Sequence, residues 1–196
     1  VFDARGIPYA LGGAIAYGLW GIPRATVDVD VNVFVRDEEL GRVTEGLCAL
    51  GATMDLAQAR EASEHAGMFV THLGGWRVDV FTPSIPFAWE ACQTRVRCVI
   101  EGRSAWFLSA ESTAVFKLLF FRAKDLVDLE RLVAVQGARL DAGYVRRWIV
   151  EMMGEDDWFD KMTPTGRDYV RLEHMRQLHA FTNHRMKAIR GTREAA

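Results

Sequence analysis

The feature that most constrains the fold is the run at residues 25–35, in which valine occupies every odd position from 27 to 35. Successive side chains of a β-strand point to opposite faces, so the valines share one face of a strand and Asp28, Asp30 and Asn32 share the other. Carboxylates two residues apart lie roughly 7 Å from each other, close enough to share cations. The run therefore predicts a strand with an apolar face and a metal-binding face. A solvated polar face is the alternative that this run alone leaves open.

A second acidic strand is predicted within residues 68–81, where two apolar-rich runs flank a Gly-Gly pair in a pattern typical of a tight hairpin. Val78 and Val80 point to one face of its second run, and Asp79 points to the other. If this hairpin extends the first sheet, a third carboxylate joins the same face. Three unneutralised carboxylates would repel one another by about 4 kcal/mol per pair at 4 Å and an effective dielectric near 20, a cost that divalent cations remove. Carboxylate oxygens favour Mg²⁺ or Mn²⁺ over zinc.

A glycine turn, Gly12-Gly13, joins a predicted strand at 7–11 to a predicted helix at 14–20. The backbone amides at the start of a helix are unpaired and positively polarised, so they favour phosphate. Such a turn is often only a tight connection. This one stands one helix before the acidic strand, where a triphosphate and its metal would meet.

The glycine turn and the acidic strands together resemble the signature of the polymerase-beta-type nucleotidyltransferase superfamily. The match consists of Gly12-Gly13, Arg24-x-Thr26 and Asp28-x-Asp30, with Asp79 as the third carboxylate. Many members carry serine after the glycines, whereas Ala14 stands here. A hydroxyl contact to the terminal phosphates is therefore missing.

A downstream motif, Lys117 followed by Lys124-Asp125, is similar to the helical motif of the AbiEii-type toxins and related bacterial branches. With it, the resemblance covers roughly residues 7–135. It implies an α/β fold, in which a small mixed sheet flanked by helices forms a catalytic domain at residues 1–108. A helical C-terminal region would follow at residues 109–196.

The resemblance also implies an activity, the transfer of a nucleoside monophosphate from an NTP to a hydroxyl group with release of pyrophosphate. Asp28 and Asp30 would hold two metal ions about 3.5 to 4 Å apart, and Asp79 would complete the site as ligand or general base. The implied nucleotide-binding residues are Gly12, Gly13, Arg24, Thr26, Lys117 and Lys124.

Two of these lysines have alternative explanations. Lys117 interrupts the apolar run at 115–121, where a freely solvated side chain is not expected. A partly buried ammonium needs an anionic partner, which can be a triphosphate or an acidic side chain. Lys124 and Asp125 either contact the substrate or pair locally with their neighbours Arg122 and Asp128.

The acceptor hydroxyl stays open between a tRNA end or other RNA, a protein side chain and a small molecule such as an antibiotic. The toxin-like motif favours RNA or protein, with a cognate antitoxin as partner. Residues 167–196 contain seven Arg or Lys against three Asp or Glu, so a helix there would either contact RNA phosphates or present a solvated basic face. Ala14 keeps a different class open, a catalytically impaired nucleotide- or antitoxin-binding protein.

Composition sets the remaining expectations. With 49% hydrophobic residues, 26% charged residues and a net charge of -2, the chain is neither generally disordered nor membrane-spanning. No signal peptide is visible, and we expect a cytoplasmic protein. Cys48, Cys92 and Cys98 lack metal-site spacing and are expected to be buried free thiols.

The rest of the chain is predicted to contain further helices and strands. These are a helix at 37–50, a charged loop at 58–65, a break at Pro83 and Pro86, strands at 95–100 and 104–108, a helix capped by Ser109, and a helix at 143–153.

Overall fold

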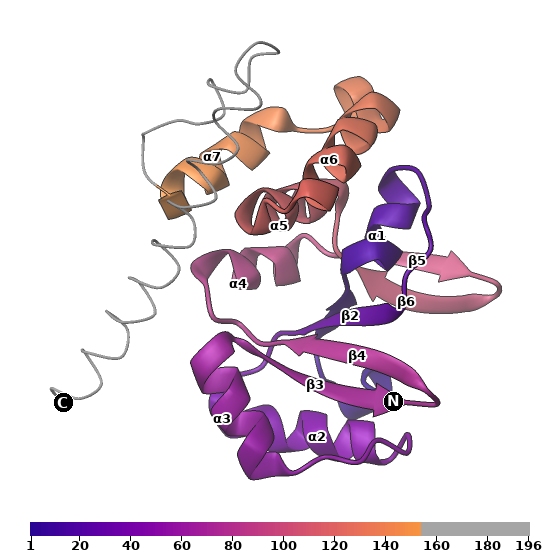
Figure 1. Cartoon of the computed structure of the whole chain (residues 1–196), viewed down its shortest axis with the longest axis vertical. Helices are drawn as coiled ribbons and strands as arrows, with labels where there is room; N and C mark the ends of the chain where they lie inside the picture. The colour runs from indigo at the N-terminus through magenta and orange to yellow at the C-terminus, as the bar shows by residue number, and fades with distance from the viewer. Residues whose placement is uncertain (154–196) are drawn as a thin grey trace, which may run out of the picture.

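The structure is a computed structural model that describes residues 1–153. Its centre is a six-stranded mixed sheet in the order β3-β4-β2-β1-β6-β5 (Figure 1). The strands are β1 (Tyr9–Leu11), β2 (Asp28–Val33), β3 (Met68–Leu73), β4 (Trp76–Phe81), β5 (Val96–Ile100) and β6 (Arg103–Phe107). The described helices are α1 (Gly13–Trp20), α2 (Leu40–Cys48), α3 (Leu56–Ala66), α4 (Pro86–Gln93), α5 (Ala110–Phe120), α6 (Ala123–Gln136) and α7 (Ala142–Met153), with 3-10 turns at Asp3–Arg5, Asp37–Glu39 and Gly137–Arg139. The predicted α/β class is confirmed.

Helices cover both faces of the sheet and build two hydrophobic cores (Figure 1). One core lies between α2, α3 and the β2-β4 half of the sheet, and contains Val31 and Val80. The larger core joins α1, α4, α5, α6 and α7 around Tyr17 and Phe87. It draws on residues from both sides of position 108, and the two-domain division at that position stays a prediction.

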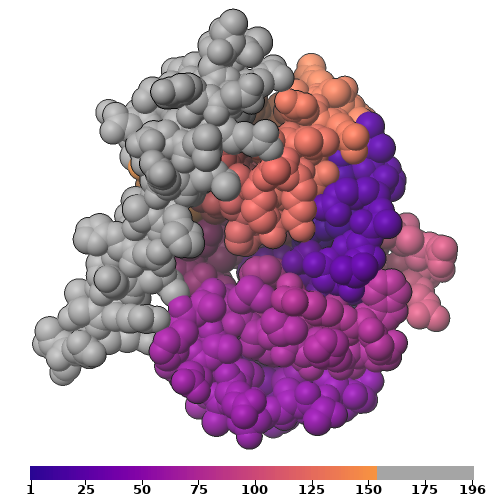
Figure 2. Space-filling model, viewed as in Figure 1, coloured from indigo at the N-terminus to yellow at the C-terminus, as the bar shows by residue number. Residues whose placement is uncertain are grey.

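The predicted strand pair at 95–108 is confirmed as the β5-β6 hairpin, whose antiparallel register pairs Ile100 with Arg103. The two turn residues, Glu101 and Gly102, have φ values of 49° and 74°. Positive φ at both central positions is the conformation of a primed two-residue turn. The hairpin projects from the body at the edge of the sheet (Figures 1 and 2).

A sharp corner joins α5 to α6. Ser109 caps the start of α5 by accepting a hydrogen bond from the Ser112 N–H at 3.0 Å, as predicted. Helix α5 ends at Phe120. The next residue, Phe121, has φ +48° although it is not glycine, and its side chain is buried. Chain reversal at this residue brings α6 back alongside α5.

The prediction of a loop at residues 58–65 is wrong, because these residues lie in α3. The Asp55 side chain caps the helix by accepting a hydrogen bond from the Gln58 N–H at 2.9 Å, and Gly67 ends it at φ +68°. The face of α3 that meets the core is built from small residues, Ala59 and Ala62. Alanines give only a weak apolar pattern, so the charged residues between them dominate the sequence signal.

Other differences concern the ends of elements. Helix α2 stops at Cys48, which leaves Leu50 exposed. The expectation of buried cysteines holds for Cys92 alone, because Cys48, at the end of α2, is exposed and Cys98 is half-buried; all three cysteines are free. Helix α4, which begins with Pro86 at its first turn, was not expected beyond the proline break.

No described helix combines the length and apolar character needed to cross a membrane. The basic segment at 167–196, and the predicted helical region beyond residue 153, lie outside the described residues.

The capping contact of α3 gives a first prediction. We expect Asp55→Ala to lower the free energy of unfolding by about 1 kcal/mol, because the Gln58 N–H loses its acceptor. Asp55→Ser keeps an oxygen at the cap and should stay within about 0.5 kcal/mol of the wild type. Urea denaturation measures both variants. An unchanged midpoint for Asp55→Ala would mean that the contact does not support α3.

Candidate active site: the acidic face of β2 and β4

The three predicted carboxylates lie on one face of two neighbouring strands. β2 and β4 pair in parallel, with Asp30 opposite Asp79 and Asp28 opposite Arg77. Valines on the other face of both strands are buried in the core under α2 and α3. Because neighbouring strands are about 4.8 Å apart, Asp30 and Asp79 are direct neighbours on the sheet. The structure therefore brings the acidic pair and the third carboxylate together, as the sequence predicts.

The glycine turn presses directly against this face. The Gly12 N–H donates to the backbone oxygen of Asp30 at 2.9 Å. A Cβ added to Gly13, whose φ is +52°, would lie 1.6 Å from Asp30 Oδ2. No side chain fits there, so glycine is required for the start of α1 to reach the Asp30 carboxylate. The turn and the acidic strand thus form one continuous surface.

Each carboxylate has a different electrostatic environment. The Thr26 hydroxyl donates to Asp28 Oδ1, and this hydrogen bond holds the pKa of Asp28 below its usual value against the effect of burial. Asp79 accepts hydrogen bonds from Arg77 Nε at 2.6 Å and Arg77 Nη2 at 3.2 Å. Among residues 1–153, no cation donates a comparable hydrogen bond to its neighbour Asp30.

Burial, together with the charges of Asp28 and Asp79, raises the pKa of Asp30 to about 6. The positive charges of Arg122 and Lys124 offset part of this increase. Asp30 is therefore the carboxylate whose negative charge is least compensated. Within residues 1–153, no three Asp, Glu, His or Cys side chains converge as a formed metal centre.

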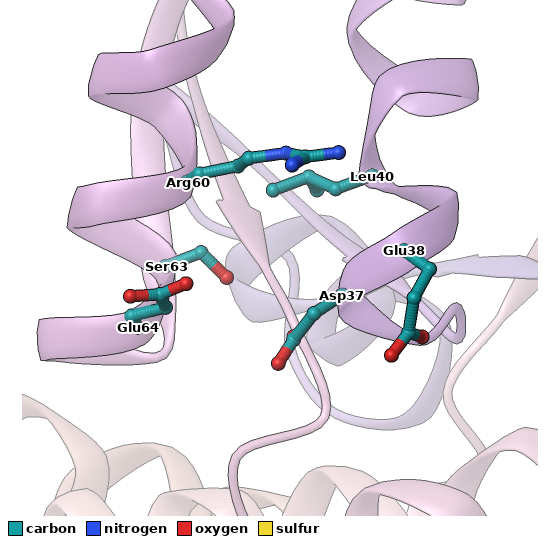
Figure 3. A pocket seen from close by; sticks show the side chains of 6 residues that line it. All are labelled: Asp37, Glu38, Leu40, Arg60, Ser63 and Glu64. Atoms are coloured by element: carbon teal, nitrogen blue, oxygen red, sulfur yellow. The ribbon is translucent and has the colours of Figure 1, made fainter.

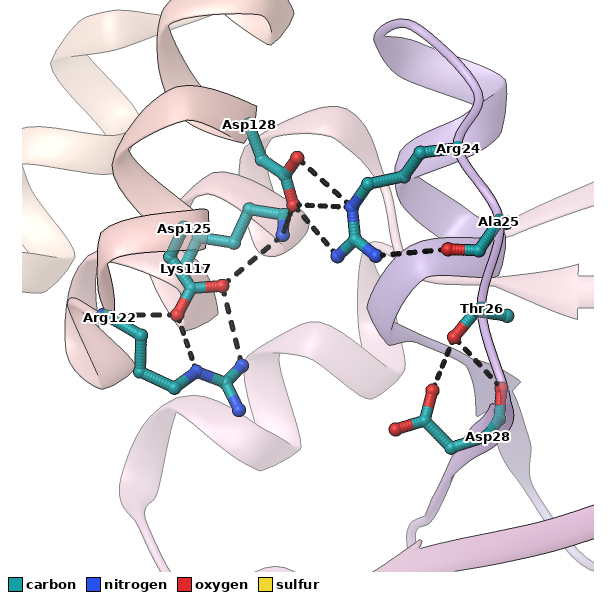
Figure 4. A network of polar contacts seen from close by, with 8 residues as sticks. All are labelled: Arg24, Ala25, Thr26, Asp28, Lys117, Arg122, Asp125 and Asp128. Carbon is teal, nitrogen blue, oxygen red and sulfur yellow. Dashed lines mark hydrogen bonds and ion pairs between the residues drawn. The ribbon is translucent and has the colours of Figure 1, made fainter.

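Beside the acidic face, a buried network of ion pairs connects the segment before β2 with α5 and α6 (Figure 4). Lys117 is only 6% exposed, and its Nζ lies 2.6 Å from Asp128 Oδ2 and 3.4 Å from Asp125 Oδ1. Arg24 donates to Asp128 through Nε and Nη2 at 3.0 to 3.3 Å. Arg122 donates to Asp125 through Nε at 2.6 Å.

The network gives Lys117 and Arg24 acidic partners from within the chain. For Lys117, this is one of the two kinds of partner that the sequence left open. Burial pushes the pKa of Asp128 upward, but the hydrogen bonds from Arg24 and Lys117 outweigh it and hold that pKa below its usual value. Direct phosphate contact by either cation stays a prediction.

The exposed Lys124 lies near enough for its charge to lower the pKa values of both Asp28 and Asp30. Sequence reasoning missed two other cations beside the carboxylates, Arg77 and Arg122. The signal for Arg77 was available, because it stands two residues before Asp79 and must share its face of the strand. Arg122 was noted only as a local partner, since its closeness to Asp30 depends on how α6 packs.

A pocket of about 130 Å³ lies elsewhere, between the start of α2 and α3 (Figure 3). Its lining residues are Asp37, Glu38, Leu40, Arg60, Ser63 and Glu64. Helices α2 and α3 cover the opposite face of the sheet from the three carboxylates. The pocket is therefore not part of the acidic site.

Comparison with solved structures identifies the fold. The chain is similar to ANT(2'')-Ia in complex with adenylyl-2''-tobramycin, with a TM-score of 0.55, 19% identity, and coverage of 76% of this chain and 91% of that chain. The solution structure of the antibiotic-resistance factor ANT(2'')-Ia gives a TM-score of 0.53 and 20% identity, with coverage of 76% and 88%. The lincomycin-bound lincosamide antibiotic adenylyltransferase LnuA gives a TM-score of 0.45 and 14% identity, with coverage of 68% and 90%.

At these identities the likeness establishes the fold, and the chain has the nucleotidyltransferase fold that the sequence signature predicts. Neither protein-family models nor curated proteins give a match to the sequence. The similarity to the AbiEii-type branch stays a prediction.

The raised pKa of Asp30 predicts an unusual pH dependence of stability. Between about pH 4 and pH 6, metal-free folded protein retains a proton on Asp30 that the unfolded chain has released. Stability should therefore fall as pH rises through this window. In EDTA at pH 7, Asp30→Asn should raise the free energy of unfolding by up to about 3 kcal/mol, at 1.36 kcal/mol per pKa unit.

The gain from Asp30→Asn should disappear below about pH 4, where the wild-type carboxyl is protonated in both states. Urea denaturation from pH 3.5 to pH 8 measures this profile. Glu38→Gln, which removes an exposed carboxyl from another part of the surface, is the control for the loss of one negative charge. A pH-independent gain for Asp30→Asn would contradict the electrostatic explanation.

The ion-pair network predicts that Lys117 supports the fold. We expect Lys117→Met to lower the free energy of unfolding by about 3 kcal/mol, because it leaves two buried carboxylates with one cation each. Lys124→Met, which removes an exposed charge, should cost no more than about 0.5 kcal/mol. If both variants are equally stable and only Lys117→Met weakens NTP binding, Lys117 binds phosphate instead.

Proposed function

We propose that the protein is a metal-dependent nucleotidyltransferase that transfers a nucleoside monophosphate from an NTP to a hydroxyl group of a small molecule. The observation that carries this proposal is the packing of Gly13 against Asp30, on a face shared with Asp28 and Asp79. This arrangement occurs within a nucleotidyltransferase fold. A small-molecule acceptor is supported by the similar structure that contains adenylyl-2''-tobramycin.

Mg²⁺ or Mn²⁺ fits the donor set of this face. The three side chains are all carboxylates. Burial and the neighbouring charges of Asp28 and Asp79 raise the pKa of Asp30, which indicates negative charge that the protein itself does not compensate. Asp28, Asp30 and Asp79 would hold the cations. To do so, Asp28 would give up its hydrogen bond from Thr26, and Asp79 would give up its hydrogen bonds from Arg77. Divalent cations bound here would neutralise phosphate charge and polarise the acceptor hydroxyl.

The chain's own groups would position the reaction. The N–H groups in the first turn of α1 face the terminal phosphates through the Gly12-Gly13 turn, without a hydroxyl at Ala14. The acceptor oxygen attacks the α-phosphorus, the bond to pyrophosphate breaks, and the hydroxyl proton passes to a carboxylate oxygen of Asp79. Each acceptor hydroxyl thus becomes one phosphodiester, with one pyrophosphate released.

The cations divide into two roles in this proposal. Arg24 and Lys117 hold α6 against α5 and the segment before β2 through Asp125 and Asp128. Lys124 and Arg122, on the more exposed end of α6, then stand beside the acidic face, where they would neutralise the triphosphate. Arg24 and Lys117 thereby serve nucleotide binding through the position of this helix end.

Ala14 favours a second candidate function, nucleotide binding without turnover. The toxin-like function, an RNA acceptor and an antitoxin partner rest on the sequence resemblance, and the basic tail that favoured RNA lies outside the described residues. These remain predictions.

One experiment separates the candidates. The purified protein is incubated with each α-labelled NTP and Mg²⁺, together with a panel of small polyhydroxyl compounds that includes tobramycin, or with total RNA, or with lysate protein. Label on a small compound supports the proposal. Label on RNA or on protein would show that this macromolecule is the acceptor and would overturn the small-molecule assignment. NTP binding without label transfer in any fraction favours the impaired binder.

The carboxylates should affect binding and chemistry differently. We expect Asp28→Asn to lower turnover at least about a hundredfold, because metal coordination contributes several kcal/mol to the transition state. Asp79→Asn should lose turnover to a similar extent while its affinity for Mg-NTP stays close to that of the wild type, since Asp28 and Asp30 still hold the nucleotide-bound cation. Calorimetry and a transfer assay measure the two effects.

Glu38→Gln is the matched control for these two variants, because it removes a carboxylate from the unrelated pocket. Full transfer by Asp28→Asn would contradict the metal assignment. Equal loss of binding and turnover in Asp79→Asn would show that Asp79 supports the structure of the face and has no separate part in chemistry.

A further inference from the structure

We propose that Arg77 is a built-in competitor of the divalent cation: it occupies the Asp79 carboxylate in the metal-free protein and must leave before Asp79 can bind metal. This inference rests on the proposed function, because it concerns the same acidic face. It adds a positioning residue that sets the cation affinity of the site and that belongs to no part of the family signature seen in the sequence.

Arg77 is placed for this role by the strand itself. It stands two residues before Asp79 on β4, so both side chains lie on the same face. The parallel register sets Arg77 opposite Asp28, next to the Asp30 and Asp79 pair. Its guanidinium engages both carboxylate oxygens of Asp79, Oδ1 at 2.6 Å and Oδ2 at 3.2 Å. The same oxygens are the ones that a metal would need.

The two partners differ in exposure. The Arg77 side chain is 52% exposed, whereas that of Asp79 is 12% exposed. A guanidinium with access to water can leave the pair without becoming a buried, unpaired charge. The Asp79 carboxylate cannot move to water in the same way, so it requires a replacement cation when Arg77 departs. The pair is therefore suited to exchange one cation for another.

The other two arginine–carboxylate pairs near the site are built differently. Asp125 and Asp128 are almost fully buried, and each contacts Lys117 in addition to its arginine. If one cation is removed from Asp125 or from Asp128, a second cation still contacts that carboxylate. Among the described residues, only Arg77 donates hydrogen bonds to the Asp79 carboxylate. Release of this single arginine would free both Asp79 oxygens.

Competition has a thermodynamic consequence. Any metal that binds through Asp79 must break the contact with Arg77, so the measured affinity is lower than that of the same carboxylates without the arginine. Arg77 thus provides partial charge compensation before the metal arrives and lowers the affinity for it. Removing Arg77 should tighten cation binding, and it should do so only while Asp79 is present to receive the metal.

The test is a titration of EDTA-stripped protein with Mn²⁺ alone, without nucleotide, followed by calorimetry or electron paramagnetic resonance. We expect Arg77→Gln to tighten Mn²⁺ binding about fivefold, the range of a partly exposed ion pair. Lys124→Gln is the matched control. This substitution removes a nearby positive charge that acts on the carboxylates only through space, so the Mn²⁺ affinity should stay within about twofold of the wild type.

A double-mutant cycle separates direct competition from a general charge effect. In an Asp79→Asn background, Arg77→Gln should no longer tighten Mn²⁺ binding. The proposal is overturned if the gain is the same in both backgrounds, if Lys124→Gln gives the same gain, or if Arg77→Gln leaves the affinity unchanged or weaker. Thermal melts in EDTA test whether each variant is folded. Arg77→Lys keeps the positive charge but cannot bind both carboxylate oxygens at once, so its Mn²⁺ affinity should lie between those of the wild type and Arg77→Gln.

Failure of the proposed function would look different. Asp30→Asn should weaken Mn²⁺ binding regardless of Arg77. If Asp30→Asn and wild type bind Mn²⁺ equally, the metal site is absent, and both the proposed function and the inference fall. If Asp30→Asn weakens binding but Arg77→Gln does not tighten it, only the role of Arg77 is overturned.

Discussion

The parallel pairing of β2 with β4 is the constraint on which the candidate site depends. It places Asp30 beside Asp79 on one face and directs the valines of both strands into the core on the other. Since side chains alternate along a strand, a shift of either strand by one residue would turn its carboxylates into that core and its valines outward. The hydrophobic effect on the valine face therefore fixes the geometry of the charged face.

The charge distribution around this face follows from how far each group can reach water. Asp125 and Asp128 are buried, and both are held between two cations. Asp28 is stabilised by the Thr26 hydroxyl. Asp30, which lies between two other carboxylates and against a glycine turn, has no comparable compensation. The carboxylates that hold α6 are thus neutralised, whereas on the acidic face negative charge remains least compensated at Asp30.

Sequence reasoning recovered the elements whose patterns are strong and local. The valine alternation of β2 predicted its two faces, and the Gly-Gly hairpin placed Asp79 on a second strand that the structure joins to the first. Helix α3 was missed because its core contacts are alanines, although Asp55 followed three residues later by Gln58 is a pattern typical of a helix start. The sequence left two kinds of partner open for Lys117, a triphosphate or an acidic side chain. It could not decide between them, because the position of Asp125 and Asp128 depends on where α6 packs after the corner at Phe121. The pairing of Arg77 with Asp79 was overlooked although strand alternation implied it.

The corner at Phe121 has a consequence for the order of folding. A left-handed conformation costs a residue with a side chain roughly 1 kcal/mol or more, and here the buried ring anchors it. The contacts made across this corner, from Lys117 to Asp125 and Asp128, join residues close in sequence, so little chain entropy is lost in forming them. The β2-β4 pairing instead joins distant segments, which is the slower kind of event. We therefore expect the two helices to associate early and the acidic face of β2 and β4 to form later.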